Sequence, residues 1–187
     1  MELRKTMKYL EYYKEIHATQ KYGEGKNLPF NVFANWCEAR KVRSILDYGA
    51  GQSPFAVNVG EKIGAEEVVR YDPAIKEIEV RPDRKFDVIF CTDVLEHIPE
   101  EELGEALSYM RDHSKYALIV IHTGLAKHKL SNGENAHVTV KGKNWWQQLF
   151  SKYSELCSYV GVPDGVFKNN PQRHLFSLTF DKSELMC

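Results

Sequence analysis

The segment Ser44–Ser53, with the sequence SILDYGAGQS, constrains the fold of this chain more than any other. Its short apolar run predicts a buried strand, and Asp47 stands near the end of that run, just before a turn built on Gly49 and Gly51. A strand that delivers a carboxylate to its C-terminal end, followed by backbone without side chains, suits a nucleoside-bearing cofactor. The segment therefore predicts an α/β fold with a cofactor pocket at the end of its first strand.

Strands and helices alternate from residue 42 onward, which indicates a mostly parallel sheet with helices on both faces. The predicted strands are 44–47, 67–71, 86–91, 116–122, 156–161 and 174–180, and the predicted helices are 54–63, 100–112 and 143–152. The last two strands have no room for a good helix between them, so we expect an antiparallel C-terminal hairpin. The predicted fold class is a Rossmann-like, doubly wound α/β sheet.

The length of 187 residues, 43% of them hydrophobic, suits one well-buried core, so we expect a single globular unit. The first forty residues have helical spacing in two pieces, interrupted at Tyr22–Gly25. We expect residues 1–40 to form a helical lid segment over the cofactor pocket of a domain formed by residues 41–187.

Charge and cysteine usage exclude several classes of protein. The chain has 25 Lys and Arg residues against 26 Asp and Glu residues, so it lacks the overall basic field that drives non-specific binding to nucleic acid. Cys37, Cys91, Cys157 and Cys187 form no CxxC pair, which predicts free thiols in a reducing compartment. No stretch approaches the ~18 apolar residues of a membrane span, and Met1–Lys5 lacks the apolar core of a signal peptide. We expect a cytoplasmic protein.

Three acids follow three predicted strands: Asp47, Asp72 and Asp93. Ligands of an open parallel sheet bind outside the carboxyl ends of its strands, so these acids should converge on one crevice. An acid at the end of the second strand is suited to accept hydrogen bonds from a ribose diol. Ser53 replaces the third glycine of a dinucleotide fingerprint, which disfavours a nicotinamide-dependent oxidoreductase. Together with Asp47 before the turn, this disfavours a pyrophosphate and favours a cofactor that carries a cationic amine or a sulfonium.

At this point the chain resembles the class I S-adenosylmethionine-dependent methyltransferases. Leu46–Ser53 resembles their first motif, Tyr71–Pro73 their ribose-binding acid and Phe86–Ile98 their fourth-strand motif. The three motifs lie in order within residues 42–125, the part of the chain that the resemblance covers.

The resemblance implies roles for the residues at the strand ends. Asp47, Gly49 and Gly51 would surround the methionine part of S-adenosylmethionine, Asp72 would hold the ribose hydroxyls, and Asp93 would border the methyl-transfer site. Either of the first two acids, taken alone, could instead cap a loop at a strand end.

The segment between Asp72 and Asp87 departs from the family pattern. It has only 14 residues, where the family places a helix, a third strand and the loop that touches adenine. A crossover with its helix needs at least ~10–12 residues before any strand is added. We therefore expect the third strand and helix region to be shortened, which leaves the adenine side of the pocket undefined.

A second group of residues suggests the chemistry. In a helical turn Asp93, Glu96 and His97 would face the same way. His137 lies in the segment that follows the next predicted strand, 116–122. Glu96, His97 and His137 could hold a divalent metal ion such as Mg or Mn that acidifies a substrate hydroxyl. The pattern is similar to that of the metal-dependent small-RNA 3′-terminal 2′-O-methyltransferases and of some quinone-biosynthesis O-methyltransferases.

Two other interpretations of these residues stand beside the metal. Asp93, His97 or His137 could act as catalytic groups without a metal, with a histidine as general base, or the whole set could be structural. Lys127, Lys129, Lys141, Lys143 and Trp145-Trp146 could likewise form a lip for an anionic acceptor or single-stranded nucleic acid, or be solvated lysines beside a packed helix.

The function that we expect is methyl transfer from S-adenosylmethionine to an oxygen, or less readily a nitrogen, of a small-molecule or terminal nucleotide or sugar acceptor. Such a transfer needs donor and acceptor to be aligned and one proton to be removed. The alternative is an S-adenosylmethionine-binding regulatory or accessory protein without transferase activity. Acceptor specificity should reside in residues 1–40 and 123–172, the parts least like the shared family core.

Overall fold

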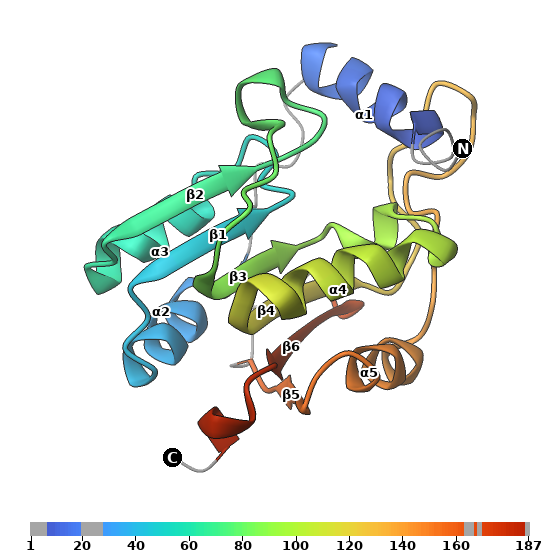
Figure 1. The fold of residues 1–187 in the computed structure, drawn as a ribbon. Coiled ribbons are helices and arrows are strands. Elements are labelled where there is room, and N and C mark those ends of the chain that lie inside the picture. The colour runs from blue at the N-terminus through green and yellow to red at the C-terminus, as the bar shows by residue number, and fades with distance from the viewer. Residues whose placement is uncertain (1–6, 20–27, 163–166, 168–169, 186–187) are drawn as a thin grey trace.

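Six strands form one sheet, in the order β2-β1-β3-β4-β6-β5 (Figure 1). The computed structural model describes residues 7–19, 28–162, 167 and 170–185. The strands are β1 (Ser44–Tyr48), β2 (Glu67–Tyr71), β3 (Phe86–Thr92), β4 (Ser114–His122), β5 (Leu156–Val160) and β6 (Arg173–Thr179). Strands β1 to β4 run parallel to one another, whereas β6 is antiparallel to both β4 and β5. The predicted Rossmann-like sheet with a C-terminal antiparallel hairpin is confirmed.

Helices cover both faces of the sheet. These helices are α2 (Phe30–Ala39), α3 (Phe55–Ile63), α4 (Leu103–His113) and α5 (Lys143–Ser151), while α1 (Met7–Thr19) lies near the carboxyl ends of the strands. Alternate residues of β3 point to opposite faces of the sheet. Val88 and Phe90 pack in the core under α2 and α3. Ile89 and Cys91 pack in the core under α4 and α5. Figure 1 shows α3 and α4 on opposite sides of the sheet. This period of two on a strand buried from both sides is the packing of a doubly wound sheet.

The predicted element boundaries hold to within three residues. The largest difference is at residues 100–112, which the sequence predicts as one helix. Glu100–Glu102 form a 3₁₀ turn and the α-helix begins at Leu103. Pro99 lies in an extended conformation before the turn, and the Glu102 N–H donates to its carbonyl. Tight 3₁₀ turns are frequent at the start of an α-helix.

The crossover between β2 and β3 is short, as the sequence predicts. Residues 72–85, all of which the structure describes, contain only the 3₁₀ turn Lys76–Ile78. As a result β1 lies between β2 and β3, and β2 is an edge of the sheet. The third strand and helix of the family pattern are thus missing, and the loop 72–85 takes their place at the side of the pocket.

The two N-terminal helices lie in different places. α2 packs against α3 through buried residues such as Phe33 and Cys37, so it belongs to the core of the domain. α1 lies near the carboxyl ends of the strands, where Ile16 packs on Leu130 and Ala136 (Figure 1). Within the described part of the lid predicted for residues 1–40, α1 borders the pocket and α2 does not. The lid role itself stays a prediction.

Several sequence predictions concern residues outside the described part of the chain: the break at Tyr22–Gly25, the N-terminal Met1–Lys5 and Cys187. The other cysteines, Cys37, Cys91 and Cys157, are free thiols. Among the described helices, none combines the length and the apolar character needed to cross a bilayer.

Candidate active site

The turn after β1 leaves bare backbone at the edge of the sheet. Gly49 and Gly51 have φ values of 76° and 52°, a region that glycine enters without strain. The N–H groups of Gly49 and Ala50 both donate to the carbonyl of Tyr71, at 2.8 and 3.0 Å. A Cβ atom on Gly49 would lie 2.5 Å from Cγ2 of Val94. The turn therefore needs glycine for its conformation and for its close approach to the loop after β3.

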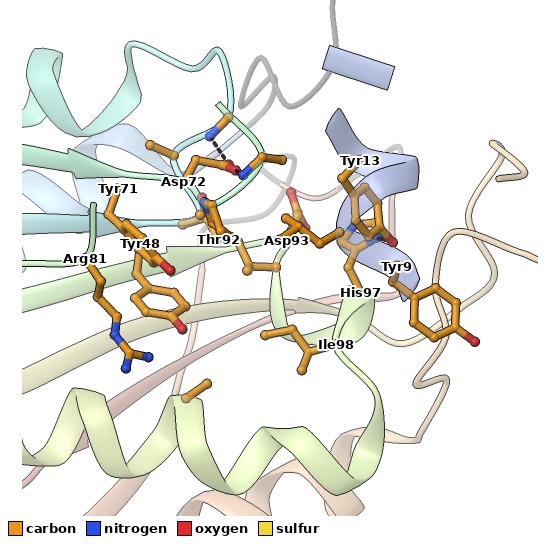
Figure 2. A pocket seen from close by; sticks show the side chains of 18 of the residues that line it. Tyr9, Tyr13, Tyr48, Tyr71, Asp72, Arg81, Thr92, Asp93, His97 and Ile98 are labelled. Atoms are coloured by element: carbon orange, nitrogen blue, oxygen red, sulfur yellow. Dashed lines mark hydrogen bonds between the residues drawn. The ribbon is translucent and has the colours of Figure 1, made fainter. Parts of the chain in front are cut away.

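A cavity of about 290 Å³ lies above this turn (Figure 2). Its walls come from the ends of β1, β2 and β3, from the start of α4, and from Tyr9, Leu10, Tyr13 and His17 of α1. The predicted site residues that line it are Gly49, Gly51, Asp72, Asp93 and His97. The cavity thus lies at the carboxyl ends of the parallel strands, where an open α/β sheet binds its ligands.

Asp72 is held firmly at the end of β2. Its Oδ2 accepts a hydrogen bond from the Gly51 N–H and its Oδ1 accepts one from the Ala74 N–H, both at 2.9 Å (Figure 2). The side chain is buried but lines the cavity. Each carboxylate oxygen has a second lone pair, so Asp72 can also accept hydrogen bonds from a ligand.

Asp47 lies beneath the glycine turn and is absent from the cavity wall. The pKa of its carboxyl group is raised to about 7, chiefly by burial; Arg70 on the paired strand opposes the shift and the nearby Asp72 adds to it. The strand end therefore brings Asp47 close to the pocket without placing it in contact with the cavity. Asp47 therefore contributes to the electrostatic field beneath the glycine turn.

Asp93 follows β3 in a left-handed conformation, with φ of 55°. Its carboxylate forms an ion pair with Arg173 of β6, in which Nη2 lies 2.6 Å from Oδ2. Burial raises the pKa of Asp93 and the Arg173 charge lowers it. Asp93 lines the cavity, but its carboxylate is turned into this pair and does not join Glu96 and His97.

Glu96, His97 and His137 come together in one cluster. One ligand atom from each lies within 4.8 Å of the other two, which makes them a possible metal-binding group within the described part of the chain. Glu96 is fully buried: its Oε1 accepts a hydrogen bond from the His122 N–H at 2.9 Å, and its Oε2 has no hydrogen-bond partner among the described residues. Burial, and then the charge of Asp93, raise the pKa of Glu96 well above its usual value. Among the described residues, the cluster thus presents a carboxyl oxygen without a hydrogen-bond partner beside two imidazoles.

The two imidazoles of the cluster each have one nitrogen against a backbone carbonyl. Nδ1 of His97 lies 2.9 Å from the Ala136 oxygen, and Nδ1 of His137 lies 2.5 Å from the Gly124 oxygen. A carbonyl only accepts, so both Nδ1 atoms carry the hydrogen and both Nε2 atoms carry the lone pair. Burial, reinforced by the neighbouring His137, lowers the pKa of His97 to about 3, and burial also lowers the pKa of His137. Neutral imidazoles of this kind can accept a proton or bind a cation.

Comparison with known proteins identifies the family. A family model described as a methyltransferase domain matches residues 20–163. The chain belongs to the methyltransferase domain family. The prediction of an S-adenosylmethionine-dependent methyltransferase is thereby confirmed at the level of family and fold. No curated protein matches this methyltransferase by sequence.

Solved structures share its fold at low sequence identity. One is the 1,6-didemethyltoxoflavin-N1-methyltransferase of Burkholderia thailandensis, solved with 1,6-didemethyltoxoflavin and S-adenosylhomocysteine: TM-score 0.64, 13% identity, 96% of this chain and 92% of that chain. Another is the methyltransferase domain of bacterial CtHen1, with TM-score 0.57, 10% identity, and 80% and 96% of the two chains. A third is an O-methyltransferase family protein of Burkholderia thailandensis, with TM-score 0.61 and 12% identity. This match covers 80% of the methyltransferase described here, which spans about half (54%) of that longer chain.

The basic and aromatic stretch after the cluster is divided between core and surface. Trp146 is fully buried with Phe150 and Phe176, so it is a packing residue. Lys141 pairs with Glu100 at 2.8 Å, and Lys143 lies over the ring of Tyr159. Neither tryptophan nor either of these lysines lines the cavity.

Some residues of the site carry no sequence signal. Arg173, Tyr13 and Arg81 each come from segments outside the three motifs, and only the fold brings them to the cavity or to its acids. Tyr13 is recognisable in the sequence as part of a helical repeat, but that pattern does not distinguish a core tyrosine from one that faces a pocket. His128, on the same loop as His137, is exposed and lies outside the metal-binding group.

Proposed function

We propose that this methyltransferase moves a methyl group from S-adenosylmethionine to an oxygen atom of a small-molecule or terminal nucleotide or sugar acceptor, with a divalent metal ion held by Glu96, His97 and His137. The observation that carries the proposal is the buried Glu96 carboxylate, whose Oε2 has no partner among the described residues and lies beside two neutral imidazoles. A buried carboxylate of this kind is costly unless a cation or a proton compensates it.

The cavity suits S-adenosylmethionine, the methyl donor, along the whole length of the cofactor. The bare backbone of Gly49 and Gly51 would lie against the methionine part, and Asp72 would accept hydrogen bonds from the ribose hydroxyls. The side chains of Tyr48, Tyr71 and Arg81 continue the wall beyond Asp72, where we place the adenine (Figure 2). The sulfonium end then faces Asp93 and His97. S-Adenosylhomocysteine is bound in the Burkholderia N1-methyltransferase of the same fold.

The donor set of the cluster fits a divalent ion. One carboxylate oxygen and two imidazole nitrogens suit Mn²⁺ better than Mg²⁺, because Mg²⁺ prefers oxygen ligands. The two Nδ1–H groups are already engaged with backbone carbonyls, which is the usual way in which a protein orients metal-binding histidines. A divalent ion bound there would supply positive charge that lowers the pKa of an acceptor hydroxyl.

In this proposal the residues of the chain align the two reactants and remove the hydroxyl proton. In methyl transfer the carbon–sulfur bond of the donor breaks as the bond from the acceptor oxygen to that carbon forms, and the hydroxyl proton must leave. The cavity walls align the two reactants, since such alignment provides much of the rate of an in-line displacement. His97 lines the cavity, and in a route without a metal its imidazole would take up the proton as a general base, although burial lowers its pKa to about 3 and so weakens it as a base. This metal-free route is the second candidate mechanism.

Binding and turnover assays separate these possibilities. Calorimetry should show S-adenosylhomocysteine binding that Asp72→Asn weakens at least tenfold, whereas Asp83→Asn, an exposed acid of the same loop, leaves it unchanged. Transfer of labelled methyl groups to a small-molecule extract should need a divalent metal and should be lost in Glu96→Gln. Absence of S-adenosylhomocysteine binding in the wild-type protein contradicts the proposal.

The remaining alternatives have their own outcomes. If chelation leaves turnover intact while His97→Ala abolishes it, the general-base route is correct and the metal route is wrong. Tight cofactor binding with no transfer to any acceptor pool would instead identify a cofactor-binding regulatory protein.

A further inference from the structure

α1 and the loop that carries His137 are packed together. Three side-chain hydrogen bonds join them, namely Tyr9 to Glu134 at 2.9 Å, Ser131 to Glu15 at 2.9 Å and Tyr13 to the Ala136 carbonyl at 2.7 Å. Ile16 of the helix adds an apolar contact with Leu130 and Ala136. The helix is therefore attached along its length to the loop 123–142, and it also forms one wall of the cavity.

Of the two tyrosines in these hydrogen bonds, Tyr13 also touches the cluster of Glu96, His97 and His137. Its hydroxyl oxygen lies 3.0 Å from Nδ1 of His97, and the two rings meet edge to face with centroids 5.4 Å apart (Figure 2). The hydroxyl of Tyr9, one helical turn earlier, reaches Glu134 on the surface of the loop. The two tyrosines thus present the same chemical group to different parts of one loop.

The contacts of Tyr13 determine where hydrogens lie around His97. Nδ1 of His97, the Tyr13 hydroxyl and the Ala136 oxygen form a triangle with sides of 2.9, 3.0 and 2.7 Å. The carbonyl can only accept, so the hydroxyl donates to it and Nδ1–H is directed at the carbonyl and the hydroxyl oxygen. Two acceptors on one side of the ring restrict both its tautomer and its rotation, which leaves Nε2 as the nitrogen with a lone pair.

We propose that Tyr13 is a positioning residue that keeps His97 in its Nδ1–H form and in the orientation in which Nε2 is offered to a cation at Glu96 and His137. The role as a metal-site residue rests on the proposed function. It makes α1, 84 positions away from His97 in sequence, part of the site as well as its wall. Outer contacts of this type commonly change metal affinity by 10–100-fold when they are removed.

The test compares Tyr13→Phe with Tyr9→Phe in the full chain, because each variant removes one hydroxyl from the same helix. Calorimetric titration with Mn²⁺ alone should give an affinity about tenfold weaker for Tyr13→Phe. Tyr9→Phe should stay within about twofold of the wild-type protein, since its hydroxyl does not touch the cluster.

A second measurement needs no metal. In the metal-free protein, ¹⁵N NMR of the His97 ring should show a single Nδ1–H tautomer. It should become mixed in Tyr13→Phe, because this variant loses one acceptor of Nδ1–H and also the hydroxyl that fixes the other acceptor, the Ala136 carbonyl. It should stay single in Tyr9→Phe. An Nε2–H tautomer in the wild-type protein overturns the proposal even if the variant does not fold. Unchanged Mn²⁺ affinity together with an unchanged tautomer in Tyr13→Phe also overturns it, as does an equal loss in Tyr9→Phe.

The outcomes also separate this proposal from the proposed function. A wild-type protein that binds no Mn²⁺, but in which Tyr13→Phe still alters the His97 tautomer, would disprove the metal site and support the positioning of His97. A wild-type protein that binds Mn²⁺ with the same affinity as Tyr13→Phe would support the metal site and disprove the positioning role of Tyr13.

Discussion

Arg173 clamps Asp93 with two nitrogens, Nε at 3.1 Å from Oδ1 and Nη2 at 2.6 Å from Oδ2. The arginine stands at the start of β6, paired with His122 at the end of β4, while Asp93 follows β3. Both side chains are mostly buried, with 16% and 21% of their surface exposed. A bidentate pair in this position engages both carboxylate oxygens, so we expect Asp93 to shape the cavity wall and to be a poor general base.

Removing the arginine should therefore destabilise the protein strongly. Arg173→Met leaves the Asp93 charge without its partner in a low-dielectric environment, which typically costs about 3–5 kcal/mol of unfolding free energy. Asp93→Asn in the same background should recover much of that loss, because the uncompensated charge is then gone. Urea denaturation of the two single variants and the double variant measures the coupling. Additive losses would show that the pair contributes little.

Alanine substitutions at Gly49 and Gly64 separate the cost of backbone strain from the cost of a steric clash. Both have positive φ, 76° and 67°, but a Cβ on Gly49 would lie 2.5 Å from Val94, whereas a Cβ on Gly64 would meet nothing within 4 Å. Gly64→Ala should cost only the strain of a left-handed alanine, about 1 kcal/mol. Gly49→Ala should cost clearly more and should also reduce S-adenosylhomocysteine binding. Equal unfolding free energies for the two variants would show that the loop after β3 yields to the extra methyl group.

The strands and most of the cofactor wall were predictable from sequence because their signals are local. Apolar runs that end in Asp47, Asp72 and Asp93 specify buried parallel strands, and the short interval before Asp87 specifies a missing strand. The direction in which an acidic side chain points depends on residues that are distant in the sequence. Asp47 lies under the turn, and Asp93 is bound by an arginine 80 positions away, since β6 inserts beside β4. Tyr13 reaches His97 only because α1 packs on a distant loop.

Asp47 should make stability depend on pH. Its pKa is about 7 in the folded protein against an ordinary value of 3.8, because burial penalises the charged form. The folded state therefore binds the proton more tightly than the unfolded chain does. The stabilisation is complete below pH 3.8 and is lost as pH rises to about 7, by up to about 4 kcal/mol.

Asp47→Asn tests this dependence, since asparagine has the shape of the protonated acid and does not titrate. The difference in unfolding free energy between the variant and the wild-type protein should grow in favour of the variant from pH 4 to pH 7 and then level off. Urea denaturation at several pH values gives the two curves. Parallel curves would mean that Asp47 titrates alike in the folded and unfolded states.

Arg81 tests where the adenine lies. The short crossover brings its guanidinium to the cavity wall, 4.6 Å from the ring centroid of Tyr109 and 3.1 Å from Glu105. A guanidinium beside aromatic rings can stack on a planar base, an interaction worth about 1–3 kcal/mol. Arg81→Met should therefore weaken S-adenosylhomocysteine binding by about tenfold, as measured by calorimetry.

The matched control is Arg84→Met. Arg84 belongs to the same crossover but pairs with Glu67 and lies over Phe86, away from the cavity. Its removal should leave the affinity within about twofold of the wild-type value, because it touches no wall of the pocket. If Arg81→Met binds S-adenosylhomocysteine as the control does, the base does not lie against Arg81. The wall formed by Pro73 and Ala74, which follow Asp72 in the chain, would then be the place for adenine.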